Sequence, residues 1–387
     1  MSSAKKVFSI ASKTHGGDSP LLISWQPKQG TYLAVVGSNR TLIIYDRNGQ
    51  PAEKLPLLDT VANIQWDKDG DMLAAICEKL PIIILWDSNR RKLNQIESSF
   101  KDPMTFLTWS KTASILAVGT AKGNLLIYNH SSSKKIPIMG KHTKRITTGA
   151  WSKDGLLALA GDDKMLTITD ESGDTVRQTQ LKDQPYALMF SERKEDVKSQ
   201  LLEGTISLVL NKRTIYLYSI DRPDNPIELA FQSKYGSIVN YHWYGDGYII
   251  IGFAQGYITA VSTHAKEIGT ELFQLRSHKN YLGDIVVSKT LNKAASCGDA
   301  CIKTYELTDL KDVESIINLE DLGQNLYELF WSEDGQLLAV STPNGTVGVY
   351  LMKLPLVASV CSHRIAYMTS LKEITIYDHL SKARVIN

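Results

Sequence analysis

The sequence is poor in cysteine, and its four cysteines stand far apart. Cys77, Cys297, Cys301 and Cys361 are too few and too scattered for the disulfide framework of a small secreted domain. Cys297 and Cys301 flank an expected turn, but no further cysteine or histidine stands at the spacing of a zinc site. We therefore expect buried or half-buried reduced thiols and no bound metal ion.

Long apolar runs and an excess of one charge are also missing. The chain has no run of about eighteen apolar residues, and its N-terminal segment lacks the apolar core of a signal peptide. Lysine and arginine number 43 against 41 aspartates and glutamates, which gives a net charge of +2. This balance provides no general attraction to nucleic acid. We expect a cytoplasmic chain without a nucleic-acid partner.

The sequence does contain one repeated pattern, which consists of three short strand-like segments. Its clearest copy runs from Phe106 to Tyr128, where small polar residues, Gly119 and Gly123 separate three apolar pieces. The pieces are too short for helices and are bounded by turn residues, so they are expected to be strands. Eight copies occur, and most follow one another after about 40 to 44 residues.

An anchor residue ends the first segment of each copy. Val287 stands at this position in one copy, and the other seven copies have an aromatic residue there. The aromatic anchors are Trp25, Trp66, Trp109, Trp151, Phe190, Trp243 and Trp331. We expect these side chains to be buried inside the repeating units.

The repeat period predicts an all-β fold, a WD40-type β-propeller with eight blades, and seven blades as the alternative. The lone N-terminal strand Val7–Ile10 is expected to pair with Val347–Tyr350 and close the ring, which would hide both sheet edges. The predicted propeller covers residues 1–352. Residues 353–387 are predicted to be a linker or the first strands of a following domain, with two strands in 361–378. The charged insert 191–203 is expected to be a surface loop or a short helix.

Several runs resemble one family of WD-repeat proteins, the WD-repeat subunits of intraflagellar transport complex A. These runs lie in loops as well as strands, and they include Trp66–Asp71, Leu116–His130, Gly140–Thr147 and Arg364–Leu371. The resemblance implies a non-catalytic protein-interaction scaffold in retrograde ciliary transport and in the delivery of membrane-protein cargo to cilia. It implies other complex A subunits as partners, a location in the cytoplasm, cilium and ciliary base, and a second propeller after this one.

Two histidines are expected to serve the fold. His142 and His278 precede a first strand, while Asp163 and Asp299 lie in turns between second and third strands. In WD repeats these positions form structural His–Asp pairs, in which the carboxylate orients the ring. A catalytic histidine would also need a nucleophile or substrate within reach, and the sequence names none.

The densest basic cluster lies around the start of the fourth repeat. We predict that it binds an acidic partner, namely a complex A subunit, a cargo adaptor or an anionic membrane, with a solvated loop as the alternative for any single residue. No aromatic residues are interleaved for stacking on bases, which argues against nucleic acid. The cluster consists of Lys134, Lys135, Lys141, Lys144 and Arg145, within twelve residues.

Motifs of the common catalytic sites are absent. No Gly-rich phosphate loop and no Ser/His/Asp arrangement at a recognisable spacing occurs. Asp-Gly pairs such as Asp69-Gly70 lack the alternating acidic ligands of a calcium loop and are expected to be turns. We therefore expect no enzyme and no cofactor. Two alternatives stay open: a propeller-fold hydrolase, which channel-mouth carboxylates or histidines would favour, and a stand-alone peptide or ubiquitin reader, which an aromatic-lined central pocket would favour.

Overall fold

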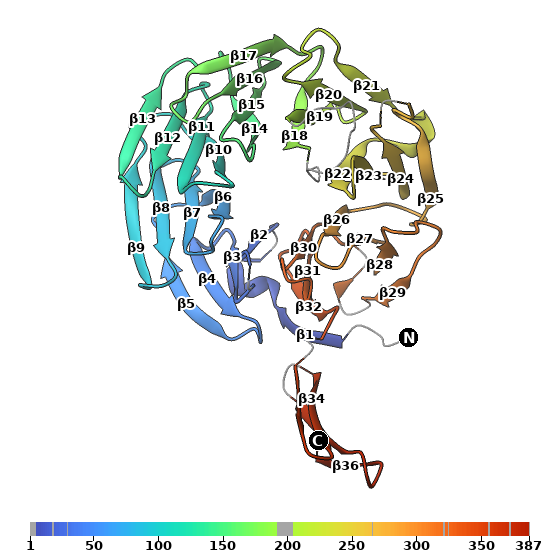
Figure 1. Ribbon diagram of the computed structural model, residues 1–387. Coiled ribbons are helices and arrows are strands. Elements are labelled where there is room, and N and C mark those ends of the chain that lie inside the picture. Colours follow the sequence, from blue (N-terminus) through green and yellow to red (C-terminus); the bar gives the residue numbers. More distant parts are fainter. Residues whose placement is uncertain are drawn as a thin grey trace.

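The fold is a ring of β-sheets. The computed structural model describes residues 5–17, 19–28, 30–191, 204–264, 266–319, 322–323, 325–354, 357–370 and 373–386. These residues form nine four-stranded antiparallel sheets, and eight of them surround a central axis as the blades of a propeller (Figure 1). The predicted all-β fold and its eight blades are therefore confirmed. The predicted insert 191–203 lies, apart from Ser191, outside the described residues.

Each of the first seven blades contains four consecutive strands, with the first at the centre of the ring and the fourth at the rim (Figure 1). The second and third strands are nearly continuous apolar runs, because neighbouring blades cover both of their faces. Blade 1 consists of β2 (Leu22–Trp25), β3 (Tyr32–Val36), β4 (Thr41–Asp46) and β5 (Pro51–Pro56), and blade 2 consists of β6 (Val61–Trp66), β7 (Met72–Cys77), β8 (Ile82–Asp87) and β9 (Lys92–Glu97). Blade 3 consists of β10 (Met104–Trp109), β11 (Ile115–Thr120), β12 (Leu125–Asn129) and β13 (Lys134–Ile138), and blade 4 consists of β14 (Ile146–Trp151), β15 (Leu157–Gly161), β16 (Met165–Thr169) and β17 (Thr175–Gln180).

The next three blades follow the same plan. Blade 5 consists of β18 (Pro185–Phe190), β19 (Thr205–Leu210), β20 (Thr214–Ser219) and β21 (Ile227–Ala230). Blade 6 consists of β22 (Ile238–Tyr244), β23 (Tyr248–Phe253), β24 (Tyr257–Ser262) and β25 (Glu271–Arg276). Blade 7 consists of β26 (Asp284–Ser288), β27 (Lys293–Gly298), β28 (Cys301–Glu306) and β29 (Ser315–Asn318). Two short 3-10 helices, η1 (Ser12–His15) and η2 (Ser233–Tyr235), lie in connecting loops. Within the described ranges, no helix has the length and apolar character needed to cross a membrane.

The eighth blade takes its outer strand from the N-terminus. β30 (Leu329–Trp331), β31 (Leu337–Ser341) and β32 (Val347–Leu351) are completed by β1 (Lys5–Ile10). β1 pairs antiparallel with β32, from Lys5 opposite Leu351 to Ile10 opposite Val347. This confirms the predicted closure, and it places the beginning and the end of the ring in one sheet, so that neither edge is left open.

A ninth sheet follows the ring and lies outside it (Figure 1). It contains β33 (Ala358–Cys361), β34 (Arg364–Ser370), β35 (Glu373–Asp378) and β36 (Ala383–Ile386). β34 and β35 are the two strands predicted in 361–378, and β33 and β36 complete a four-stranded sheet around them. Cys361 on β33 is exposed, whereas Cys77, Cys297 and Cys301 are buried free thiols. The expectation that every thiol is covered was therefore wrong for Cys361, because β33 is exposed along its length.

Tryptophan side chains join neighbouring blades at the ends of the first strands. The indole N–H of Trp109 donates to the carbonyl of Gln65 at 3.1 Å, and that of Trp151 donates to the carbonyl of Thr108 at 3.2 Å. Trp66 bonds the carbonyl of Ser24 in the same way, at 3.2 Å. Each acceptor directly precedes the anchor of the preceding blade, so these bonds fix how one blade sits on the next.

The same bond closes the ring. Trp25 donates to the carbonyl of Phe330, the residue before Trp331, at 3.0 Å. Trp243 departs from the pattern and donates to Ser207 Oγ at 2.8 Å, in the blade anchored by Phe190. Trp331 is half-buried, and its indole N–H has no partner among the described residues.

Candidate functional site

One face of the ring collects the loops that lead from each blade to the next and the turns between second and third strands. We call it the loop face. Arg145, in the loop before β14, and Ala121, in the turn after β11, line a groove of about 400 Å³ together with Ala62 and Thr105 at the starts of inner strands. This groove therefore joins the loops and turns of the loop face to the starts of the inner strands.

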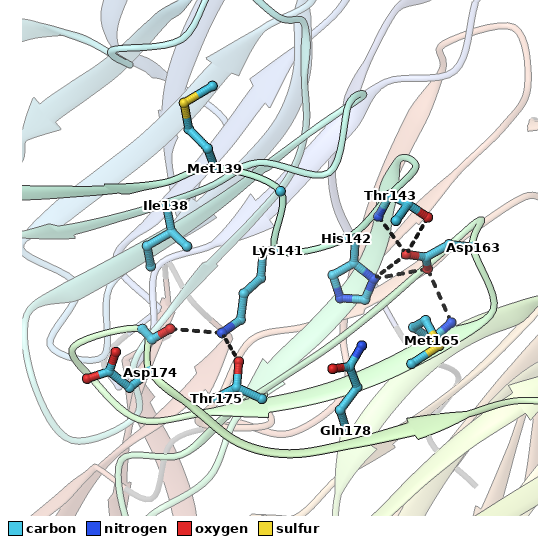
Figure 2. Close-up of a pocket in the computed structure, with 12 residues that line it drawn as sticks. Ile138, Met139, Lys141, His142, Thr143, Asp163, Met165, Asp174, Thr175 and Gln178 are labelled. Carbon is cyan, nitrogen blue, oxygen red and sulfur yellow. Dashed lines mark hydrogen bonds and ion pairs between the residues drawn. The ribbon is translucent and has the colours of Figure 1, made fainter.

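A second pocket, of about 420 Å³, lies between blades 3 and 4 (Figure 2). The end of β13 and residues 139–143 of the following loop form one wall, and the turns on both sides of β16, with the start of β17, form the other. Met139 stands at its edge with 81% of its side chain exposed, an unusual position for a large apolar residue. Three of the residues predicted to act at a site, Lys141, His142 and Asp163, line this pocket.

His142 and Asp163 face each other in this pocket (Figure 2). His142 Nδ1 lies 3.0 Å from Asp163 Oδ1, and the backbone N–H of Thr143 donates to Asp163 Oδ2 at 2.9 Å. Burial opposes ionisation of Asp163, but the bonds from His142 and Thr143 outweigh it and hold the pKa of the carboxyl below its ordinary value. The Thr143 hydroxyl also points at the carboxylate and not at the imidazole, so no nucleophile–base–acid chain is formed.

The second predicted pair is arranged differently. His278 Nε2 lies 2.8 Å from Ser296 Oγ, and Asp299 instead accepts the backbone N–H groups of Lys279 and Asn280. The expected hydrogen bond between His278 and Asp299 is therefore not present. Burial lowers the pKa of His278 to about 4, so the ring is neutral at physiological pH. Ser296, on β27, also lies 2.9 Å from the hydroxyl of Tyr305 on β28, so the ring of His278 is held by a chain of hydroxyl groups.

The five basic residues do not lie together. Lys134 and Lys135 are exposed at the start of β13, opposite Asn129 and Tyr128, whereas the loop that holds the other three follows the far end of that strand. Lys135 Nζ donates to the carbonyl of Glu97 at 3.1 Å. The cluster therefore divides between two edges of blade 3.

Lys141 is engaged within the fold (Figure 2). Its Nζ donates to the carbonyl of Gly173 at 2.8 Å and to Thr175 Oγ1 at 2.6 Å, and burial lowers the pKa of the ammonium group. Lys144 and Arg145 are exposed, and their side chains make no ion pair with any described residue. Only these two of the five thus remain available on the loop face.

A pair of carboxyl groups that the sequence did not reveal lies between blades 7 and 8. Asp284 accepts an N–H of Asn240 at 2.8 Å and the backbone N–H of Leu329 at 3.0 Å, so it connects blades 6, 7 and 8. Burial raises the pKa of Asp284 to about 6. Burial and the neighbouring Asp284 raise the pKa of Glu328 to about 7. Two carboxyls at adjacent repeats escape sequence analysis because neither belongs to a motif.

Near the starts of the inner strands, the loop face also exposes large apolar side chains that sequence analysis missed. Tyr186, Val239 and Tyr327 are 41%, 37% and 40% exposed. Each stands four residues before the anchor of its blade, at Phe190, Trp243 or Trp331. That spacing is visible in the sequence, but it does not by itself indicate exposure, because Leu21, at the same spacing before Trp25, is only 2% exposed.

The part of the chain that the structure describes has no group of three or more histidine, cysteine, aspartate or glutamate side chains placed to hold a metal ion. His142 and Asp163 orient a turn, His278 is bonded to a serine, and Lys141 ties two blades together. These predicted site residues thus hold loops and turns of the fold in place.

Comparison with known proteins identifies the kind of propeller. Residues 21–345 match the family described as "WDR19 first beta-propeller". The chain is 50% identical over 372 residues to WD repeat-containing protein 19 of Mus musculus, covering 96% of this chain and 28% of that protein. It is 34% identical over 371 residues to WD repeat-containing protein dyf-2 of Caenorhabditis elegans, covering 95% of this chain and 26% of the relative. The chain thus spans little more than a quarter of these relatives.

Solved structures agree on the fold. Sqt1 from Chaetomium thermophilum matches with a TM-score of 0.71 at 13% identity, over 90% of this chain and 99% of that one. Sqt1 from Saccharomyces cerevisiae also gives 0.71, at 11% identity, over 92% of this chain and 100% of that one. Identity this low supports the architecture alone, whereas the family match extends through strands and loops alike. The chain belongs to the family of WDR19 first β-propellers.

Proposed function

We propose that this propeller is a non-catalytic protein-interaction scaffold of intraflagellar transport complex A, acting in retrograde ciliary transport and in delivery of membrane-protein cargo to cilia. The observation that carries the proposal is the 50% identity to WD repeat-containing protein 19 over 96% of the chain. Other complex A subunits are its partners, with a cargo adaptor as a further one, and its location is the cytoplasm, the cilium and the ciliary base.

The domain boundary is part of this proposal. Residues 1–352 form the scaffold, and residues 353–387 lead into a following domain. Exposed apolar residues of the ninth sheet and of its last turn favour this division, since Val360 on β33, Ile374 on β35 and Leu380 in the turn after β35 are 68%, 56% and 76% exposed. A four-stranded sheet with such a surface requires further layers to cover it.

Within the scaffold, Lys144 and Arg145 are proposed to contact an acidic partner surface. Their side chains are exposed on the loop face, while Lys141 is occupied by Gly173 and Thr175. Lys134 and Lys135 lie at the other end of β13 and provide a charge-matched control. Exposed lysines contribute little to stability, so charge reversal leaves the fold intact while it weakens a charged interface.

The test is a pull-down of complex A subunits from ciliated cells. The wild-type chain is compared with Lys144→Glu/Arg145→Glu and with Lys134→Glu/Lys135→Glu, at two salt concentrations. The proposal is supported if Lys144→Glu/Arg145→Glu lowers the recovery of these subunits and Lys134→Glu/Lys135→Glu does not. If the wild-type chain recovers no complex A subunits, the scaffold role is contradicted. Flotation with phosphatidylserine vesicles separates a membrane contact from a protein contact. An esterase, phosphatase and peptidase screen addresses the hydrolase alternative, and turnover abolished by a mutation at the channel mouth would establish it.

A further inference from the structure

The pocket between blades 3 and 4 has apolar surface that the fold does not cover (Figure 2). Ile138 and Met165 are half-buried in its lining, and Met139 is 81% exposed at its edge. The backbone next to Met139 is held in place, because the N–H of Gly140 donates to the side chain of Asn124 at 2.9 Å. Large exposed apolar side chains often mark a contact with a partner. The pocket therefore offers apolar surface at a defined position.

The ammonium group in this pocket is already bound. Lys141 Nζ donates to the carbonyl of Gly173 and to Thr175 Oγ1, which uses two of its three N–H donors. Burial also lowers the pKa of this ammonium group. Lys144, the next lysine along the chain, does not line the pocket. Among the described residues of the lining, the cation is thus committed to joining two blades, and an acidic ligand has no free partner.

Two side chains of blade 4 in the lining can accept hydrogen bonds and have no partner within the described ranges. The carboxylate of Asp174, in the turn between β16 and β17, is exposed and makes neither a hydrogen bond nor an ion pair there. Asp170 adds a second negative charge to this turn, and both carboxylates act to raise the pKa of Lys141 against the effect of burial. The amide of Gln178 on β17 is exposed and unbonded as well. This wall therefore attracts donors, and positively charged donors most.

His142 contributes a third acceptor. Its Nδ1 lies 3.0 Å from Asp163, and an ionised carboxylate only accepts, so the proton of the neutral ring is on Nδ1. Nε2 then has a lone pair, and this atom is buried without a partner among the described residues. A buried acceptor without a donor is unfavourable, and a donating ligand in the pocket would relieve it.

We propose that this pocket, with Met139, Asp174 and Gln178 around it, binds an arginine side chain that a partner protein presents next to an apolar residue. The guanidinium group has five N–H donors and no acceptor, which matches a free carboxylate beside a free amide carbonyl. The methylene stem of the arginine and the neighbouring apolar residue contact Ile138 and Met139. The proposal rests on the interaction role of the ring and specifies the chemistry of one partner.

The size of the pocket and its acceptors favour arginine over other ligands. Its volume of about 420 Å³ suits one long side chain better than a whole domain. Lysine fits less well, because its ammonium group is a compact, strongly hydrated charge and does not reach two acceptors through a planar fork.

The test uses the whole chain and a display library of random short peptides. Selection on the wild type is expected to enrich peptides that have arginine beside leucine, methionine or phenylalanine. Synthetic winners are then measured by fluorescence anisotropy. Asp174→Lys should weaken their binding about tenfold or more and remove most of its salt dependence, and Met139→Ser should weaken it about three- to tenfold. Replacing the arginine of the peptide by citrulline, which keeps the shape but not the charge, should also cost about tenfold.

Asp224 and Leu272 provide the matched controls. Asp224 is an exposed carboxylate in the corresponding turn of blade 5, and Leu272 is 49% exposed on β25. Asp224→Lys and Leu272→Ser make the same kinds of change elsewhere on the ring and should bind the peptides as the wild type does. Since all four substituted side chains are exposed, thermal melts of the variants should match that of the wild type.

Each other outcome counts against the proposal. No enrichment, or enrichment of acidic peptides, overturns it, and so does a citrulline peptide that binds as tightly as the arginine peptide. Arginine peptides that bind Asp174→Lys as well as the wild type, or that lose as much affinity for Asp224→Lys, occupy another surface and overturn the assignment to this pocket. Recovery of complex A subunits in the pull-down is independent of these measurements, so the scaffold role can stand while the arginine pocket fails.

Discussion

The indole hydrogen bonds between blades allow a direct measurement of what holds the ring together. Trp109 is 4% exposed and donates to the carbonyl of Gln65 in the preceding blade. Trp109→Ala removes a buried side chain and should lower the free energy of unfolding by about 3 to 5 kcal/mol. Trp109→Phe keeps most of the apolar volume but removes the donor and leaves the carbonyl without this partner, which should cost about 1 to 3 kcal/mol.

Trp331 provides the matched control. It occupies the same register in blade 8, but its N–H has no partner among the described residues and its side chain is only half-buried. Trp331→Phe should therefore cost less than Trp109→Phe by about 1 kcal/mol, the typical net value of one hydrogen bond. Urea unfolding followed by fluorescence and circular dichroism measures both, and agreement of the two probes supports two-state treatment. Equal losses at the two positions would show that packing alone joins the blades.

Three further results are expected. The pKa of Asp284 is raised to about 6 and that of Glu328 to about 7, so the folded state holds more protons than the unfolded chain, and the contribution of these groups to stability falls as pH rises from about 4 to 7. In Glu328→Gln, this fall in the free energy of unfolding should be smaller by roughly 1 to 2 kcal/mol. Parallel pH profiles of the wild type and the variant would refute the raised pKa of Glu328. Asp163→Ala should lower the free energy of unfolding by about 1 to 3 kcal/mol, because His142 and the Thr143 N–H lose their acceptor. Asp299→Ala frees only exposed backbone donors and should lower it by less. Chemical denaturation of both variants measures the difference. Deletion of β1 should open the edge of β32 and cause concentration-dependent association in sedimentation, while a monomer of unchanged stability would show that closure is dispensable.

The sequence alone determined the architecture, because each blade repeats the same local requirements. Short apolar runs, turn residues and anchors such as Trp109 recur at one period, so the number of blades and the closing strand could be read without any long-range contact. The register of Tyr186, Val239 and Tyr327 was also present in the sequence, since each stands four residues before an anchor. Nothing local, however, indicated that these side chains are exposed.

Only the tertiary structure decided which side chains meet. Lys134 and Arg145 are near in sequence, but β13 carries them to opposite ends of a strand, while Lys212 and Tyr186 are brought together across a blade. Asp284 and Glu328 become neighbours because consecutive inner strands stand side by side around the axis. His278 likewise contacts Ser296 and not Asp299, because which strand residue lies next to a loop depends on the three-dimensional geometry and not on spacing along the chain. Repetition specifies the blades, and the way the blades are packed specifies the surface.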